Sequence, residues 1–166
     1  MGKYFGTDGF RGEANVELTV EHAYKVGRFL GWYYGQKNPE ERCQVVIGKD
    51  TRRSSYMFEY ALVSGLTASG ADVFLLHVTT TPSVSYVVRT EGFHCGIMIS
   101  ASHNPYYDNG IKVINEKGEK LEEAVSGRQD GGASSCKEGF DRPYRGFCSR
   151  KKPLYRISDL DGNAFL

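Results

Sequence analysis

The sequence predicts a three-layer α/β/α domain in which helices cover both faces of a mostly parallel, mixed β-sheet. Short runs of β-branched and aliphatic residues alternate with stretches of helical periodicity, three times in succession. Glycine or polar residues close each short run, as expected where a buried strand ends. A chain of 166 residues is also long enough for one domain with a substantial core. Parallel strands joined by helical crossovers explain this order.

The expected elements begin after a turn-rich opening. Thr19 is a candidate N-cap, and apolar residues then recur at helical spacing. In order, the sequence predicts a helix from Thr19 to Tyr34, a buried strand at 43–48, a helix from Ser54 to Leu66, a buried strand at 71–78, a short helix from about Pro82, and a third strand at 95–100. Further on, residues 111–115 and 120–123 flank a Glu-Lys-Gly turn, which predicts a hairpin on one edge of the sheet.

The character of the chain changes near residue 125. Residues 126–166 are rich in glycine, serine and arginine and show neither helical nor strand periodicity over most of their length. We therefore assign 1–125 to the folded domain and 126–166 to an irregular C-terminal tail. A shifted reading frame is our hypothesis for the tail, and the nucleotide sequence around codon 126 would test it.

Composition favours a small partner. The net charge is +1, from 21 basic and 20 acidic side chains, so no strong field attracts nucleic acid or an anionic membrane. No stretch approaches the ~20 apolar residues of a spanning helix, and the opening lacks the apolar run of a signal peptide. We expect a cytoplasmic protein. The four cysteines form no CxxC pair, so a structural zinc site is not expected.

Three loops leave the carboxyl ends of the expected strands, where ligands bind in doubly wound sheets. They comprise residues 48–54, 79–83 and 100–110, and an earlier loop brings Arg11 on a glycine-flanked turn. A tight Asp-Asn-Gly turn at 108–110 is expected to return the next strand beside the third. Side chains from these loops are thus expected to meet in one crevice.

Ser102 is the pivotal residue of the third loop. A serine hydroxyl needs a base beside it, or must itself carry the group to be transferred. His103 and Lys112 are the nearest basic residues, but the loop is not the nucleophile elbow of a serine hydrolase. In phosphoryl transfer, positioning and charge neutralisation matter most, and Arg11, Lys112 and Arg52 could hold a phosphoserine.

Each of these residues also has a simpler explanation. Ser102 and Asn104 could only stabilise a turn, His103 could be a surface residue, and Lys112 a solvated side chain of an edge strand. Asp50 and Arg52 could pair locally within a capped turn. The residues alone leave these alternatives open.

Four segments in order resemble the first domain of the phosphohexomutases: "YFGTDGFRG", "VVIGKDTRRS", "TTTPSVSY" and "GIMISASHNPYYDNGIKV". The resemblance covers residues 1 to about 125, and the opening is more similar to the phosphoglucosamine mutase branch than to the phosphomannomutase and phosphoglucomutase branch. It implies that Ser102 carries a phosphoryl group that passes to a phosphorylated hexosamine and returns from the bisphosphate, interconverting glucosamine 6-phosphate and glucosamine 1-phosphate.

The same resemblance implies the remaining roles. Arg11 would steady the phosphoserine, His103 and Lys112 would handle protons, and Asn104 and Arg52 would help to bind phosphate. One phosphoryl oxygen on Ser102 would bind Mg²⁺.

Beyond residue 125 the chain departs from the family. The aspartate-rich loop that holds Mg²⁺, the sugar-reading loop and the C-terminal phosphate loop have no counterpart in the sequence. We therefore expect weak or absent Mg²⁺ binding, no turnover by the chain alone, and self-association through an exposed domain interface. Specificity for glucose or mannose phosphates, a non-catalytic phosphate-binding or interaction domain, and a serine hydrolase are the alternatives. Ser55 also stands where the family often has glycine.

Overall fold

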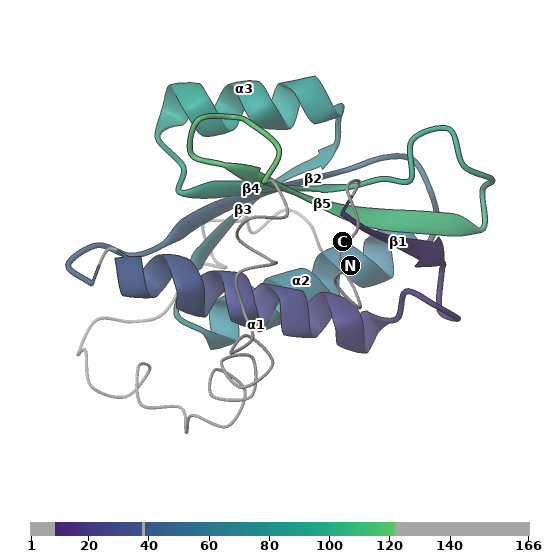
Figure 1. Cartoon of the computed structure of the whole chain (residues 1–166), viewed down its shortest axis with the longest axis horizontal. Coiled ribbons are helices and arrows are strands. Elements are labelled where there is room, and N and C mark those ends of the chain that lie inside the picture. The colour runs from purple at the N-terminus through teal and green to yellow at the C-terminus, as the bar shows by residue number, and fades with distance from the viewer. Residues whose placement is uncertain (1–8, 38, 122–166) are drawn as a thin grey trace, which may run out of the picture.

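The structure is a computed structural model, and it describes residues 9–37 and 39–121. Figure 1 shows a sheet with α3 on one face and α1 and α2 on the other. The elements in chain order are β1 (Phe10–Glu13), α1 (Val20–Lys37), β2 (Gln44–Lys49), α2 (Ser55–Ala68), β3 (Asp72–Val78), α3 (Thr81–Glu91), β4 (Cys95–Ile99) and β5 (Asp108–Asn115). The expected tail and its boundary at residue 125 lie outside the described residues.

The sheet is mixed, with the strand order β1-β5-β4-β2-β3. Strand β2 pairs in parallel with both β3 and β4, whereas β5 pairs antiparallel with both β4 and β1. The parallel strands are those that alternate with helices, as crossover connections require. The predicted three-layer α/β/α fold class is confirmed.

Strand β3 is not the buried strand that its apolar sequence predicted. It lies at one edge of the sheet, and Phe74 and Val78 are 44% and 51% exposed. Its pairing with β2 shifts by one residue after Leu75, and His77 takes the left-handed conformation with φ 55°. A bulge of this kind is common at sheet edges. An apolar run therefore located the strand but not its burial.

Two expectations at the other side of the sheet need correction. Arg11 does not lie on a turn, because residues 10–13 form the edge strand β1. Strand β5 is not an edge hairpin, since it lies between β4 and β1, and residues 108–110 begin this strand instead of forming a turn. The expected partner segment contributes only an isolated bridge from Ile114 to Lys120 and a hydrogen bond from the Leu121 amide to the Val113 carbonyl (2.9 Å).

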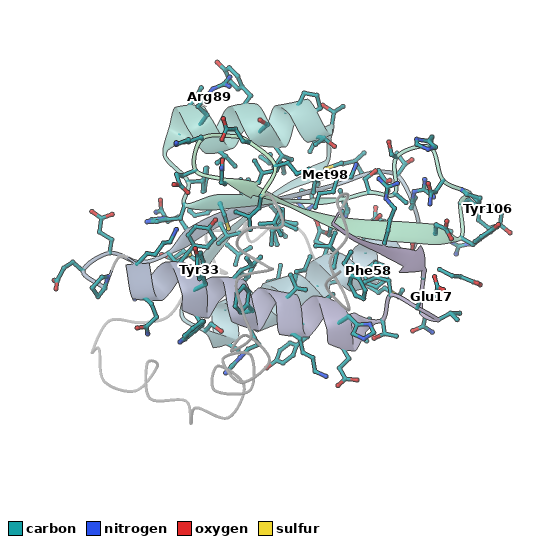
Figure 2. The ribbon with its side chains drawn as sticks, viewed as in Figure 1. Glu17, Tyr33, Phe58, Arg89, Met98 and Tyr106 are labelled. Carbon is teal, nitrogen blue, oxygen red and sulfur yellow. The ribbon has the colours of Figure 1, made fainter. Side chains whose placement is uncertain are left out.

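The core is divided by the sheet into a larger and a smaller cluster. Phe58 belongs to the larger cluster, between the sheet and α1 and α2, and Met98 to the smaller one beneath α3 (Figure 2). Burial raises the pKa of the Cys43 thiol to about 12 and that of Cys95 well above its usual range, so both act as apolar core residues.

Glycines bring the layers close together. A Cβ on Gly96 would lie 2.5 Å from Val88 Cγ2, so α3 packs directly on the strand backbone. Helices α1 and α2 approach in the same way, because a Cβ on Gly65 would lie 2.2 Å from the Tyr24 carbonyl oxygen. None of the three described helices is long and apolar enough to cross a membrane.

Replacing Gly65 with alanine should destabilise the domain by about 1–3 kcal/mol, because the new methyl group collides with the backbone of α1. Gly35→Ala is the matched control: a Cβ there meets nothing within 4 Å, so better helix propensity should stabilise the domain by up to about 1 kcal/mol. Chemical denaturation of both variants measures the difference. Equal effects of the two substitutions would contradict this close packing.

Candidate functional site

The residues between β4 and β5, Ser100 to Tyr107, form a loop that we call the serine loop. The Ser100 amide donates to the Gly110 carbonyl (2.8 Å), which ties the start of the loop to β5. The Ser102 amide then donates to Ser100 Oγ (3.0 Å), and Ser102 adopts φ 60°. A left-handed backbone is uncommon for a residue with a side chain and often marks a functional site. The Ser102 side chain is exposed at this strained position.

Strand pairing places Arg11 and Lys112 on one face of the sheet. Gly110 and Lys112 are two residues apart on β5, and their partners across the strands are Arg11 and Met98. Side chains alternate along a strand and opposed residues share a face, so those of Arg11, Met98 and Lys112 project toward the face covered by α3. Ser100 lies two residues beyond Met98. The basic residues and the start of the serine loop therefore share one side of the domain.

Gly110 makes room for Arg11 beside the serine loop. The position that a Cβ on Gly110 would occupy is 3.0 Å from Arg11 Cγ and 2.9 Å from the Ser100 carbonyl oxygen. Arg11 Nε is buried and has no hydrogen-bond partner within the described part of the chain. A buried donor without a partner is costly, and such a group points to a ligand that accepts from it.

Arg52 reaches the serine loop from the turn after β2. Its Nη2 donates to the carbonyl oxygens of Ser102 (3.1 Å) and Asn104 (2.8 Å), and its Nη1 to those of Pro105 and Asp108, the latter at 3.1 Å. Its Nε donates to Asp50 Oδ2 (3.0 Å). All five N–H groups of the guanidinium are thus occupied by protein acceptors. Arg52 was expected to help to bind phosphate, and in the structure its donors contact Asp50 and the serine loop.

A buried polar network lies beneath the loop. Asn109 is fully buried, and its Nδ2 donates to Ser54 Oγ (2.9 Å) and Ser55 Oγ (3.0 Å). Ser55 Oγ in turn donates to Asp50 Oδ1 (2.9 Å), while Asn109 Oδ1 accepts from the Gly110 amide (2.8 Å). The network joins the turn after β2, the N-terminus of α2 and the start of β5. Ser55 contributes a hydroxyl that glycine could not supply.

Lys49, the last residue of β2, forms a buried ion pair with Glu59 of α2. Both side chains are 1% exposed, and Lys49 Nζ also lies 3.5 Å from the centre of the Tyr56 ring. The pair fixes the end of β2 immediately before Asp50. Such a pair is weak evidence for stability, because desolvation offsets the attraction, but removing one partner is strongly destabilising.

The other predicted site residues have simpler surroundings. His103 is exposed next to Ser102, and Asn104 Nδ2 donates to Asp108 Oδ2 (2.9 Å) across the base of the loop. Figure 2 shows Tyr106 at the outer tip of the loop. In the loop at 79–83, which was expected to join the site, Thr80 accepts a hydrogen bond from the Ser83 amide (3.4 Å) as the N-cap of α3.

The family described as phosphoglucomutase/phosphomannomutase, alpha/beta/alpha domain I, matches residues 2–128. The chain belongs to this family. It is 78% identical over 125 residues to the phosphoglucosamine mutase of Lachnospira eligens, and 80% identical over 125 residues to that of Lachnoclostridium phytofermentans. Each match covers 75% of this chain, but only 28% and 27% of the respective relative.

Solved structures of the family share this fold. A phosphoglucomutase/phosphomannomutase family protein from Burkholderia thailandensis superposes with a TM-score of 0.63 at 25% identity, covering 82% of this chain and 30% of that protein. The chain thus spans less than a third of the length of the relatives named here. The resemblance of its motifs to the phosphohexomutases is confirmed.

Three residues of the domain I site escape prediction from the sequence. The sequence places Asp50 in an ordinary turn, Ser55 in the first turn of a helix, and Asn109 in a tight turn that the structure replaces with a strand. Asp-Asn-Gly is a common turn sequence, so local pattern gives the wrong answer there. The position of Asn109 directly before the strand-like segment 110–114 is the one signal that could have indicated a buried amide.

The described residues do not form a Mg²⁺ site. They contain no group of three or more histidine, cysteine, aspartate or glutamate residues that could hold a metal ion. Two carboxylates within and beneath the serine loop already accept hydrogen bonds from protein groups. Asp50 accepts from Arg52 and Ser55, and Asp108 accepts from Asn104. Mg²⁺ requires several oxygen ligands in octahedral geometry. No chemical step is therefore assigned to a metal on these residues.

Asn109→Ala should destabilise the domain by about 1–3 kcal/mol, because it leaves a buried Gly110 amide without an acceptor and removes two further hydrogen bonds. Asn104→Ala makes the same chemical change at a partly exposed position with one side-chain bond, so about 0.5–1.5 kcal/mol is expected. Urea denaturation compares the two variants. A smaller loss at Asn109 than at Asn104 would contradict the role of the buried network.

Proposed function

We propose that the chain is the phosphoserine-bearing domain I of a phosphoglucosamine mutase, with Ser102 as the residue that carries the phosphoryl group. The observation that supports this most directly is the orphaned, buried Nε–H of Arg11 beside a loop that exposes a strained serine. A phosphoryl oxygen is the acceptor that such a cation suits best. Relatives at 78% and 80% identity carry the name phosphoglucosamine mutase.

The proposed reaction is a transfer in two halves. In the first, the bond between phosphorus and Ser102 Oγ breaks and a bond to the C1 hydroxyl oxygen of glucosamine 6-phosphate forms. The proton of that hydroxyl passes to a basic side chain, and Ser102 Oγ takes up a proton. In the second half the 6-phosphoryl group of the bisphosphate returns to Ser102, which leaves glucosamine 1-phosphate.

In this reaction, some of the residues on the α3 face and in the serine loop would neutralise charge, and others would transfer protons. Arg11 and Lys112 neutralise charge on the phosphoryl group, since both project to the same side as Ser100. His103, exposed beside Ser102, and Lys112 exchange protons with the attacking and leaving oxygens. Asn104 shapes the loop through Asp108. Arg52 is not among the phosphate ligands, because its donors are occupied.

The activity of the whole enzyme extends beyond these residues. The chain spans 27–28% of its named relatives, so we assign to it the phosphate-carrying step alone. In the proposal, sugar recognition and the carboxylates for Mg²⁺ come from elsewhere in such an enzyme, which works in the cytoplasm and supplies amino sugars for cell-wall precursors. A sister specificity for glucose or mannose phosphates has weaker support. A solved putative phosphomannomutase from Thermus thermophilus is 31% identical, against 78% and 80% for the two phosphoglucosamine mutases.

Incubating the chain with glucosamine 1,6-bisphosphate should add one phosphoryl group, and peptide mapping by mass spectrometry should locate it on Ser102. Ser102→Ala should abolish the addition, whereas Ser64→Ala, a change at an exposed serine of α2, should not. Arg11→Ala should slow the addition by about 10²-fold, because a cation at the transferred group is lost.

Thermal unfolding of each variant verifies that it is folded. Phosphate on any residue other than Ser102, or a chain that remains unmodified, would refute the proposal. Fluorophosphonate labelling of Ser102 would instead support the serine hydrolase alternative.

A further inference from the structure

We propose that Arg52 is a positioning residue, which holds the serine loop in the conformation that displays Ser102. The effect of Arg52 on phosphoryl transfer depends on the function proposed above. Its effect on the loop does not, because that effect arises from contacts between described residues alone. The two effects can be measured separately.

The contacts of Arg52 extend over almost the whole serine loop and the first residue of β5. Four of its five N–H groups donate to main-chain carbonyls, those of Ser102, Asn104, Pro105 and Asp108. These acceptors lie 50 to 56 residues further along the chain. Main-chain acceptors differ from side chains because binding them fixes the path of the loop itself. The planar guanidinium presents its donors in one rigid fork, so it imposes a single arrangement on all four carbonyls.

Apart from those of Arg52, the bonds at the centre of the loop are local: the Ser102 amide donates to Ser100 Oγ, and Asn104 Nδ2 donates to Asp108 Oδ2. The Tyr107 carbonyl, at the end of the loop, accepts from the Ala14 amide (2.9 Å). The internal main-chain bonds of the loop join Asn104 to Ala101 (3.1 Å) and Asp108 to Pro105 (3.1 Å). Ser102 is also in the left-handed conformation, which costs free energy for any residue with a side chain. Arg52 binds the carbonyl of this same residue. The geometry therefore indicates that Arg52 offsets the strain at Ser102.

Asp50 holds the Arg52 side chain in the orientation that reaches the serine loop. Its carboxylate accepts from Arg52 Nε (3.0 Å) and from the Arg52 amide (3.0 Å), and it is itself held by Ser55 Oγ. The Arg52 side chain is only 12% exposed. The carboxylate orients the guanidinium and balances its charge. Arg52 therefore leaves the transferred phosphoryl group to Arg11 and Lys112.

The first test is hydrogen exchange of the serine loop, measured by mass spectrometry on the full chain. Arg52→Ala should raise the exchange rates of the hydrogen-bonded amides of Ser102, Asn104 and Asp108 by about tenfold or more, since charge-assisted bonds are lost. Arg53→Ala is the matched control, because the next residue carries the same charge on an exposed side chain. Unchanged exchange in Arg52→Ala would overturn the proposal.

Chemical rescue separates positioning from general destabilisation. Methylguanidinium at millimolar concentration should restore protection of the loop in Arg52→Ala, because it refills the space left by the fork. Methylammonium, which has the charge without the fork, should not restore it. A variant that was merely less stable would gain nothing from methylguanidinium, since guanidinium compounds weaken folded states. Absence of rescue, or equal rescue by both cations, would refute a fork-specific role.

The second test measures phosphoryl transfer to Ser102 from glucosamine 1,6-bisphosphate. Arg52→Ala should slow the transfer by about 10²-fold, as small displacements of a reacting group do, and methylguanidinium should recover part of the rate. Arg53→Ala should retain the original rate. A normal rate in Arg52→Ala would overturn the positioning role in catalysis. If the unaltered chain accepts no phosphate, the proposed function fails, and the exchange measurements alone decide the role of Arg52 in the loop.

Discussion

The antiparallel pairing of β5 with both β4 and β1 determines where the candidate site residues lie. It places Gly110 opposite Arg11 and Lys112 opposite Met98, so that the basic side chains share the α3 face. The register is secured from the other face, where Ile111 and Val113 are buried in the larger core cluster. A slip of one residue would exchange these faces, exposing the apolar residues and burying Lys112. Hydrophobic burial on one side of β5 thus fixes the polar arrangement on the other.

Polar groups buried under the serine loop add a second level of support. Asn109 joins two hydroxyls and a main-chain amide, and Asp50 links the same network to Arg52. Each bond made there removes a desolvation cost that an unpaired group would impose. The Lys49–Glu59 pair lies one residue before Asp50 and fixes the end of β2 to α2. The exposed loop therefore rests on a rigid base.

Close packing at glycines also keeps the base of the serine loop rigid. Gly65 brings α1 and α2 into backbone contact, and Gly96 lets α3 pack on the strands. Layers in such close contact move little relative to one another, because interiors are packed at the density of organic crystals. A nucleophile on a loop gains precision from a scaffold of this kind. The strain at Ser102 is held by that scaffold rather than by the loop sequence alone.

The sequence by itself determined the elements whose signal is local: the helical stripes of α1 and α2, the start of α3 near Pro82, and the apolar runs of β2 and β4. It also identified the family, because the motifs that carry the resemblance are contiguous. Only the tertiary structure decided that residues 10–13 pair as a strand, that β5 lies inside the sheet, and that Arg52 binds main-chain carbonyls of the serine loop. The physical reason is that hydrophobic periodicity indicates only which residues of a single segment are buried. Strand pairing, in contrast, depends on contacts between segments that are distant in the sequence. The acceptors of Arg52 are main-chain carbonyls, which every residue has, so the sequence does not mark them.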